Sequence, residues 1–179
     1  NFLNFDSTNS FIDSLLNLDK IDICVNNAGI NRINYLEDIP IEDYDEILRV
    51  NLYAPFLVSQ AVSKVMKKNK YGRIINVSSI WGTKTKEQRT SYTTSKAGLI
   101  GMTKTMSVEL AKYNILVNSV SPGFTSTELT KSILSEGDIK RLSEQVPLGR
   151  FASVDEISKV VLFLCSDLNT YINGQDIKI

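Results

Sequence analysis

The chain has 179 residues, of which 42% are hydrophobic and 22% charged, and its 20 basic and 20 acidic side chains cancel. That size and composition predict one globular domain with a buried core. The balanced charge gives no reason to expect nucleic acid as a partner, and no apolar run approaches the roughly 20 residues that span a bilayer, so we expect a cytoplasmic protein.

The first third of the chain contains short apolar segments separated by polar residues. Residues 2–5 are predicted to end a strand that a turn follows. Apolar residues recur at helical spacing over residues 11–16, and residues 21–25 form an apolar run typical of a buried parallel strand. The tetrapeptide Asn26-Asn27-Ala28-Gly29 then follows as a loop at the end of that strand.

A long helix, or two helices, is predicted from about residue 41 to residue 68. Asn51 falls on its apolar face, where an amide is unfavourable unless it is hydrogen-bonded. Pro55 has no N–H group, so the carbonyl of Asn51 loses its usual helical donor. The sequence therefore predicts a kink near Asn51.

The remaining elements continue the alternation. Strands are predicted over residues 73–77, 115–120 and 176–179, and a helix over residues 91–112. Residues 153–156 have the sequence of a capping box, which predicts the start of the last helix. Alternating strands and helices predict an α/β fold, a doubly wound parallel sheet with helices on both faces.

The absence of histidine restricts the chemistry. With no histidine, Ser-His-Asp and Cys-His mechanisms and histidine-ligated metals are excluded. Cys24 and Cys165 each lie in an apolar run and are predicted to be buried hydrophobes rather than a disulfide or a metal site. No metal site is expected, and proton transfer must use other side chains.

Tyr92 and Lys96 are spaced to share one face of a helix, thirteen residues after Ser79. An ammonium about 4 Å from a phenolic oxygen interacts by about 4 kcal/mol at an effective dielectric near 20. That interaction predicts a Tyr92 pKa lowered towards neutrality, suited to general acid–base chemistry. The alternative is a solvated surface pair.

The order of these motifs resembles the short-chain dehydrogenase/reductase family. Asn-Asn-Ala-Gly, Asn51, Ser79, Tyr92-x-x-x-Lys96 and Pro122-Gly123 occur in the family's order, each at a strand end or on a helix. The resemblance runs from about residue 5 to residue 179. Within the family, the sequence is most similar to the beta-ketoacyl-acyl-carrier-protein reductase branch. It implies a Rossmann-like sheet and an NAD(P)(H)-dependent interconversion of a ketone and a secondary alcohol.

The resemblance also implies four catalytic residues. Tyr92 would supply or remove the proton, and Ser79 would hydrogen-bond the carbonyl oxygen. Lys96 would lower the pKa of the phenol and hold the nicotinamide ribose. The main-chain carbonyl of Asn51 would bind a water leading towards Lys96, although Asn51 could instead be a buried amide at a helix break.

NAD or NADP is the implied cofactor, and the sequence does not choose between them. The resemblance implies that Asp6 and Ser7 contact the adenine. It implies that Asn27, Ala28 and Gly29 contact the adenosine ribose. Pro122, Gly123 and Thr125 would border the nicotinamide. Tyr92 and Lys96 would also contact the cofactor. For each group the alternative is an ordinary structural turn.

The glycine-rich turn that normally holds a dinucleotide pyrophosphate is missing before Gly29. We therefore expect residues 1–179 to be a single domain lacking its first βαβ phosphate-binding portion, about 50–60 residues, and its extreme C-terminus. Such a piece could also be inactive, or an assembly module. Small residues on the two long helices favour a homo-oligomer, either a dimer or a tetramer. These small residues are Ala54, Ala61, Ala97, Gly98 and Gly101.

The substrate would be selected by residues 80–90 and 125–151. A small-molecule ketone or alcohol is expected, first a 3-oxoacyl thioester of acyl carrier protein. Lys84, Lys86 and Arg89 make the first loop basic. They are either solvated or face the pocket, in which case they suit a phosphate, a carboxylate or a sugar. A sugar or polyol dehydrogenase is therefore the second hypothesis.

Overall fold

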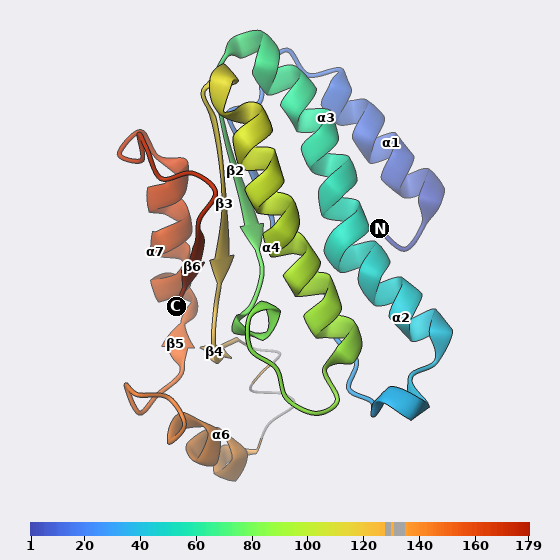
Figure 1. Cartoon of the computed structure of the whole chain (residues 1–179), viewed down its shortest axis with the longest axis vertical. Coiled ribbons are helices and arrows are strands. Elements are labelled where there is room, and N and C mark those ends of the chain that lie inside the picture. The colour runs from blue at the N-terminus through green and yellow to red at the C-terminus, as the bar shows by residue number, and fades with distance from the viewer. Residues whose placement is uncertain (128–129, 131–134) are drawn as a thin grey trace.

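The computed structural model describes residues 1–127, 130 and 135–179 of the chain. Its main feature is a four-stranded parallel sheet with strand order β1-β2-β3-β6 (Figure 1). The strands are β1 (Ile23–Asn26), β2 (Gly72–Val77), β3 (Ile115–Ser121) and β6 (Asp176–Lys178). These strands confirm the predicted positions to within two residues at each end.

Helices connect these strands. They are α1 (Phe5–Leu16), α2 (Ile41–Leu48), α3 (Ala54–Asn69), α4 (Thr90–Leu110), α6 (Glu136–Ser143) and α7 (Val154–Cys165). Short helical turns are η1 (Leu36–Asp38), η2 (Arg49–Tyr53), η3 (Ile80–Gly82) and η4 (Ala111–Tyr113). Within the described residues, no helix combines the length and the hydropathy needed to cross a membrane.

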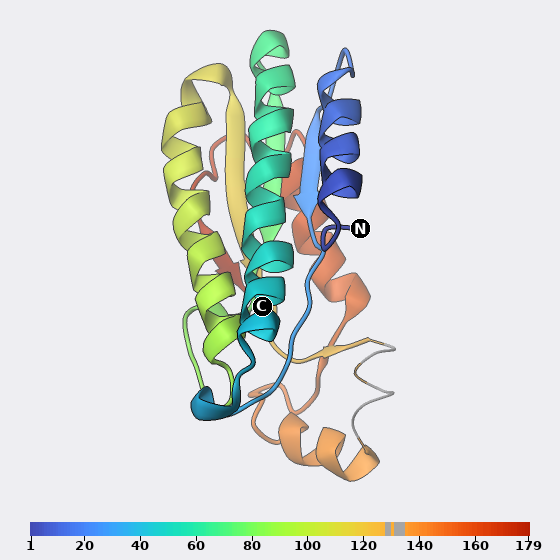
Figure 2. The same ribbon diagram turned by 90° about the vertical axis from the view of Figure 1, so that its right-hand side faces the viewer.

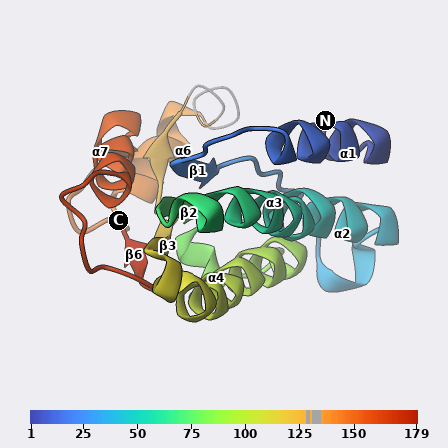
Figure 3. The ribbon, with the colours of Figure 1, turned by 90° about the horizontal axis from the view of Figure 1, so that it is seen from above.

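Helices cover both faces of the sheet, which confirms the doubly wound architecture. On one face, α1, α3 and α4 pack over the side chains of Ile74, Ile115 and Val117. On the other face, α7 packs over Ile75 and Val120. Figure 2 shows α3 and α4 in front of the strands, and Figure 3, seen from above, shows the sheet between them and α7.

All strands of this sheet run parallel, so their carboxyl ends meet at one edge. The loop after β1, the turn η3 after β2 and the short strand β4 (Thr125–Ser126) after β3 gather there. Strand β4 pairs with β5 (Ala152–Ser153) as a second, two-stranded sheet. Helix α6 lies at the same end of the molecule (Figure 1). Ligands of open α/β sheets bind at this edge.

The start of the chain differs from the prediction. Residues 2–5 do not end a strand, because α1 begins at Phe5. The side chain of Asn4 accepts a hydrogen bond from the Ser7 backbone N–H at 2.8 Å and caps the helix. An asparagine cap followed by a polar first turn favours a helix start, and this local signal outweighs the apolar residues before it.

The predicted kink is present as a π-helical turn. Residues 49–53 separate α2 from α3, and the Ala54 N–H donates to the carbonyl of Arg49. Pro55 lies in the first turn of α3, where the missing N–H is tolerated. A π-helical turn often marks a functional site, and this one contains Asn51.

One local prediction is confirmed and a second is confirmed in part. Ser153 and Glu156 form the reciprocal hydrogen bonds of a capping box at the start of α7. Cys165 is buried as predicted, whereas Cys24 is only partly buried, and burial raises the pKa of Cys24 to about 11. Part of the segment that was expected to shape the substrate pocket, residues 128–129 and 131–134, lies outside the described residues.

Candidate active site

Helix α4 carries the tyrosine–lysine pair. Lys96 is only 3% exposed, and its Nζ lies 5.7 Å from the centroid of the Tyr92 ring. The same Nζ donates a hydrogen bond to the carbonyl oxygen of Val77 at 2.8 Å. The pair is therefore held against the carboxyl end of β2, and the solvated-surface alternative does not apply.

Ser79 comes to this pair from the end of β2. Its hydroxyl caps η3 by accepting from the Trp81 N–H at 3.2 Å. It also lies close enough to the Tyr92 phenol to favour the ionised phenol and to act to lower its pKa. The neighbouring Ser78 donates to the carbonyl of Lys96 at 3.1 Å. The structure thus brings Ser79, Tyr92 and Lys96 together as the sequence predicts.

The predicted pKa of Tyr92 is wrong for this structure. Burial raises the pKa of Tyr92 above its usual value and outweighs the lowering by Ser79 and by Arg89. Burial also lowers the pKa of Lys96 to about 8. By the pH at which the phenol ionises, the Lys96 amine has therefore lost its charge. Helical spacing predicted their proximity, but it did not include this desolvation of both groups.

Asn51 is fully buried and its amide is satisfied. Its Nδ2 donates to the Ile30 carbonyl at 2.9 Å and to Ser95 Oγ at 3.1 Å, while its Oδ1 accepts from the Ile30 N–H at 2.8 Å. The Ser95 hydroxyl in turn donates to the Tyr92 carbonyl at 2.8 Å. Asn51 therefore joins the loop after β1 to the catalytic helix.

Ser95 is not among the residues predicted from the sequence. It is completely buried between Asn51 and the backbone of Tyr92. A serine three residues after Tyr92 lies one turn along the same helix, next to Lys96. That position was the only sign in the sequence that Ser95 lies near the site. Its structural role comes from the tertiary contact with Asn51 in the turn between α2 and α3.

Gly29 brings the Asn-Asn-Ala-Gly loop close to the same residues. A Cβ atom added at Gly29 would lie 3.5 Å from Asn51 Oδ1 and 3.5 Å from Lys96 Nζ. These are ordinary van der Waals distances, so the loop passes close to both side chains. The ammonium of Lys96 is shielded from solvent, since Lys96 is almost completely buried.

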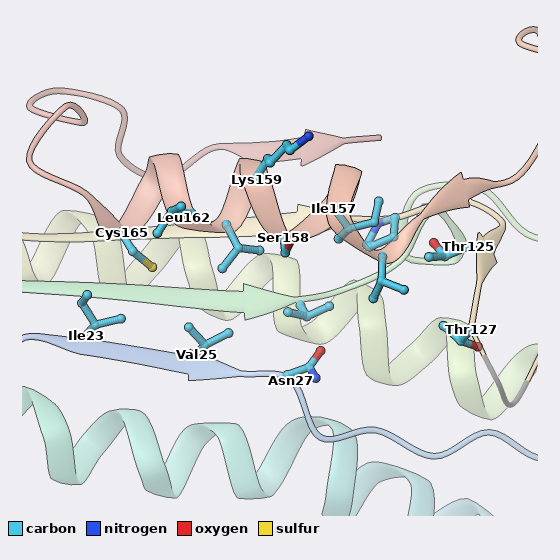
Figure 4. A pocket seen from close by; sticks show the side chains of 14 residues that line it. Ile23, Val25, Asn27, Thr125, Thr127, Ile157, Ser158, Lys159, Leu162 and Cys165 are labelled. Carbon is cyan, nitrogen blue, oxygen red and sulfur yellow. The ribbon is translucent and has the colours of Figure 1, made fainter.

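A cavity of about 790 Å³ opens beside this site, and its wall includes Asn27, Pro122 and Thr125 (Figure 4). Figure 4 places Asn27 and Thr125 towards one end and Ile23 and Cys165 towards the other. Three of the residues expected to contact the cofactor therefore share one cavity. Most of its other lining residues are apolar and come from β1 and α7.

The turn after β3 is fixed by backbone hydrogen bonds. The Gly123 N–H donates to the Ile179 carbonyl at 2.7 Å, and the Ile80 N–H donates to the Pro122 carbonyl at 3.1 Å. A Cβ added at Gly123 would lie 3.2 Å from the Ile179 oxygen. The Pro-Gly turn is thereby held against both η3 and the last strand.

Asp6 and Ser7 are exposed in the first turn of α1, not in a turn after a strand. The cavity that reaches Asn27 and Ala28 from this side is lined by Phe2 but not by Asp6 or Ser7. The adenine contact stays a prediction for this pair. Among the described residues, no three His, Cys, Asp or Glu side chains converge as metal ligands.

The chain matches known proteins along nearly its whole length. A family model described as "Enoyl-(Acyl carrier protein) reductase" matches residues 5–179. The chain is 46% identical over 180 residues to a 3-oxoacyl-[acyl-carrier-protein] reductase FabG of Aquifex aeolicus, covering 100% of the chain and 72% of the relative. It is 46% identical over 160 residues to the FabG of Thermotoga maritima, covering 89% of the chain and 65% of that relative.

Solved structures agree with this match. A gluconate 5-dehydrogenase from Burkholderia cenocepacia in complex with NADP and tartrate has a TM-score of 0.91 at 31% identity, over 99% of the chain and 71% of its own. A NAD⁺-bound xylitol dehydrogenase has a TM-score of 0.87 at 31% identity, over 99% and 75%. The chain thus spans about two thirds to three quarters of the length of these relatives. From these matches, the chain belongs to the short-chain dehydrogenase/reductase family of NAD(P)(H)-dependent oxidoreductases.

Proposed function

We propose that the complete protein interconverts a ketone and a secondary alcohol with NAD(H) or NADP(H), and that Ser79, Tyr92, Lys96 and Asn51 form its active site. The observation that carries this proposal is the buried Lys96 beside Tyr92, with Ser79 close enough to the same phenol to lower its pKa. A buried lysine and phenol with shifted pKa values at the carboxyl edge of an α/β sheet are typical of a functional site.

Tyr92 would be the proton donor. Burial raises its pKa, so the phenol keeps its proton at neutral pH. A protonated phenol is the form required to protonate a carbonyl oxygen during reduction. Ser79 would donate a second hydrogen bond to that oxygen and stabilise the negative charge that develops on it.

The residues present fit a nicotinamide dinucleotide. The cofactor would supply the hydride in reduction and accept it in oxidation. An ammonium has three N–H donors, and in the described residues Lys96 uses one of them for the Val77 carbonyl. The remaining donors would bind ribose hydroxyls. Asn27, Ala28, Pro122, Gly123 and Thr125 would border the cofactor, and Asp6 with Ser7 would lie towards its adenine.

We also infer that residues 1–179 belong to a single domain completed by a first βαβ portion on the β1 side. Strand β1 is an edge of the sheet. Its apolar side chains Ile23 and Val25 are 49% and 42% exposed. The cavity beside it is lined by apolar residues of α7. A further strand and helix would bury this surface. Without that portion, the chain would be an inactive piece or an assembly module.

This inference has a direct test. Residues 1–179 alone are expected to bind NADH and NADPH much more weakly than the complete protein, since the βαβ portion would hold the pyrophosphate. Fluorescence titration of both proteins with both cofactors measures the difference. Equal affinities would contradict the inferred role of the missing portion.

Two substrate classes have support. The FabG relatives favour a 3-oxoacyl thioester carried by acyl carrier protein. The gluconate and xylitol dehydrogenases with the same fold favour a sugar acid or polyol, and a partly buried arginine next to Tyr92 supplies a structural reason for this second class. A cytoplasmic location stays a prediction.

Assembly as a homodimer or homotetramer is also proposed. Ala54 and Ala61 are 1% and 3% exposed and belong to the core of this chain, so they do not form an assembly surface. Gly98 packs against Leu52 of the same chain. Ala97 and Gly101 are exposed one turn apart on α4, and these two small residues support the proposal.

The reaction is tested by incubating the complete protein with NADPH or NADH and an acetoacetyl thioester, and in parallel with a panel of keto acids and keto-sugars. Oxidation of the cofactor at 340 nm is expected with at least one ketone, and Tyr92→Phe is expected to abolish it. If neither cofactor is oxidised with any of these ketones, the proposed activity is wrong.

A further inference from the structure

Arg89 lies immediately before α4, three residues from Tyr92. Its side chain is partly buried, and its Nε and Nη1 are shielded from solvent without a hydrogen-bond partner among the described residues. By contrast, the buried Arg73 lacks a partner only at Nε among the described residues and binds backbone carbonyls through both Nη1 and Nη2. Shielded charged donors without partners are unfavourable, so an anion that reached Arg89 would satisfy them.

The guanidinium of Arg89 is close enough to Tyr92 to act on it. Its positive charge lowers the pKa of the phenol, and the phenol in turn acts to raise the pKa of Arg89. A group bound by Arg89 would therefore lie near the oxygen that Tyr92 protonates.

Aromatic rings border this region. The Trp81 and Phe124 ring centroids are 6.3 Å apart, and Phe124 stacks on Phe151 at 5.1 Å. Lys86 Nζ lies 5.4 Å from the centroid of Trp81. These contacts join the loop before α4 to the segments flanking the second sheet, and they give the region an apolar wall.

The charges around Arg89 are mainly positive. Burial is the main cause that lowers the pKa of Lys86, and the charges of Arg89 and Arg141 lower it further. Lys86 is therefore near both arginines. Arg141 on α6 pairs with Asp138 at 2.9 Å, whereas Arg89 and Lys86 take part in none of the ion pairs of the described residues. Exposed Glu87 lies in the same loop. The net field therefore favours an anion.

We propose that Arg89 binds an oxoanion of the substrate, a carboxylate or a phosphate a few bonds from the carbonyl that Tyr92 protonates. The site would then accept short anionic ketones, and the corresponding hydroxy acids, as a further substrate class beside acyl thioesters. The planar guanidinium suits this ligand because two of its N–H groups can bind two oxygens at once.

This proposal rests on the proposed carbonyl-reducing function. The reaction is unchanged: the carbonyl carbon gains a hydride from NAD(P)H, the oxygen gains a proton from Tyr92, and the products are a secondary alcohol and NAD(P)⁺. Arg89 takes no part in the transfer. It is a specificity-determining residue that distinguishes a charged substrate from a neutral one of the same shape.

Matched substrates test this role in the complete enzyme. Acetoacetate and acetoacetamide have nearly the same shape, but only acetoacetate carries a carboxylate. We expect wild-type kcat/KM to be about 10-fold to 100-fold higher for acetoacetate, as for hydrogen bonds between charged groups. Arg89→Gln should bring the ratio of the two values close to one. Arg89→Lys, which keeps the charge but not the fork, should give an intermediate ratio.

Lys84→Gln is the matched control, because Lys84 is an exposed cation in the same loop, and its ratio should equal that of wild type. An equal loss for both substrates in Arg89→Gln, or an unchanged ratio, would overturn the proposal. Melting temperatures of all variants show whether a loss reflects unfolding instead.

Binding to wild type separates this proposal from the proposed function. In calorimetry with NADP⁺-loaded protein, acetoacetate should bind at least about 10-fold more tightly than acetoacetamide, whether or not turnover occurs. Inorganic phosphate and tartrate should compete with acetoacetate. Selective binding without turnover would reject the reductase function but keep the oxoanion site, and equal binding of both ligands would reject the site.

Discussion

Asn51 Nδ2 and Ser95 Oγ lie 3.1 Å apart although 44 residues separate them in the sequence. Both side chains are completely buried. Through this one hydrogen bond, the π-helical turn that holds the loop after β1 is connected to the helix that carries Tyr92 and Lys96. Asn51 therefore contributes to the site by positioning other groups, whatever its main-chain carbonyl binds.

Asn51→Ala should lower the free energy of unfolding by about 2–3 kcal/mol, because it removes the partner of the part-buried N–H and carbonyl of Ile30 and of the buried Ser95 hydroxyl. Urea unfolding of the complete protein measures this. Asn9→Ala, at an exposed position of α1, is the control and should change stability by less than about 0.5 kcal/mol. Similar small effects for both variants would show that the amide network contributes little.

Tyr92→Phe should reduce kcat for ketone reduction by more than tenfold, a loss above about 1.4 kcal/mol of transition-state stabilisation. The phenol is the proposed proton donor, while the remaining ring still packs beside Lys96. Affinity for NADPH, measured by fluorescence titration, should change little. Tyr53→Phe removes a hydroxyl from a tyrosine that is 46% exposed and should keep full activity. Retention of more than a tenth of kcat in Tyr92→Phe would mean that another group donates the proton.

The buried amine of Lys96 should make stability depend on pH. Burial lowers the pKa of Lys96 from 10.5 to about 8, so between these values the unfolded chain binds more protons than the folded one. Stability contributed by this group therefore rises with pH across that window and is lowest below it. Unfolding free energies of wild type and Lys96→Met should be compared from pH 7 to pH 10.5. The wild type should gain stability relative to the variant as the pH rises, and a constant difference would contradict the lowered pKa.

Gly174 should tolerate alanine less well than Gly149. Both glycines have positive φ angles, 72° and 69°, so substitution by alanine should lower the free energy of unfolding by about 1–2 kcal/mol at either position. A Cβ at Gly174 would also lie 2.5 Å from Ser107 Oγ, whereas nothing lies within 4 Å of one at Gly149. Thermal unfolding should therefore show the larger loss for Gly174→Ala, and Gly174→Ala with Ser107→Gly should recover part of it. Equal losses would mean that Ser107 moves aside freely.

Patterns of local sequence predicted most of the fold. The parallel strands, the helix bearing Tyr92 and the break near Asn51 follow from apolar periodicity and from the missing N–H of Pro55. The start of α1 was wrong because Asn4 acts as a helix cap, and capping depends on one side chain rather than on a repeating pattern.

The site was predicted in its membership but not in its electrostatics. The spacing of Ser79, Tyr92 and Lys96 predicted which residues meet, and the structure brings them together. The pKa of Tyr92 depends on how deeply the phenol is buried, and the role of Arg89 depends on which groups surround it. Both are properties of tertiary packing, which residue spacing does not contain.

The π-helical turn at residues 49–53 makes this part of the chain sensitive to length. Each residue rotates an α-helix by about 100°, so one deletion or insertion within the turn would turn α3 about its axis relative to α2. Val58 and Val62 would then no longer face the sheet, or Asn51 would leave Ser95. Substitutions in the turn can be absorbed locally, but a frame-preserving loss or gain of a single codon there would force a choice between an intact core and an intact active site.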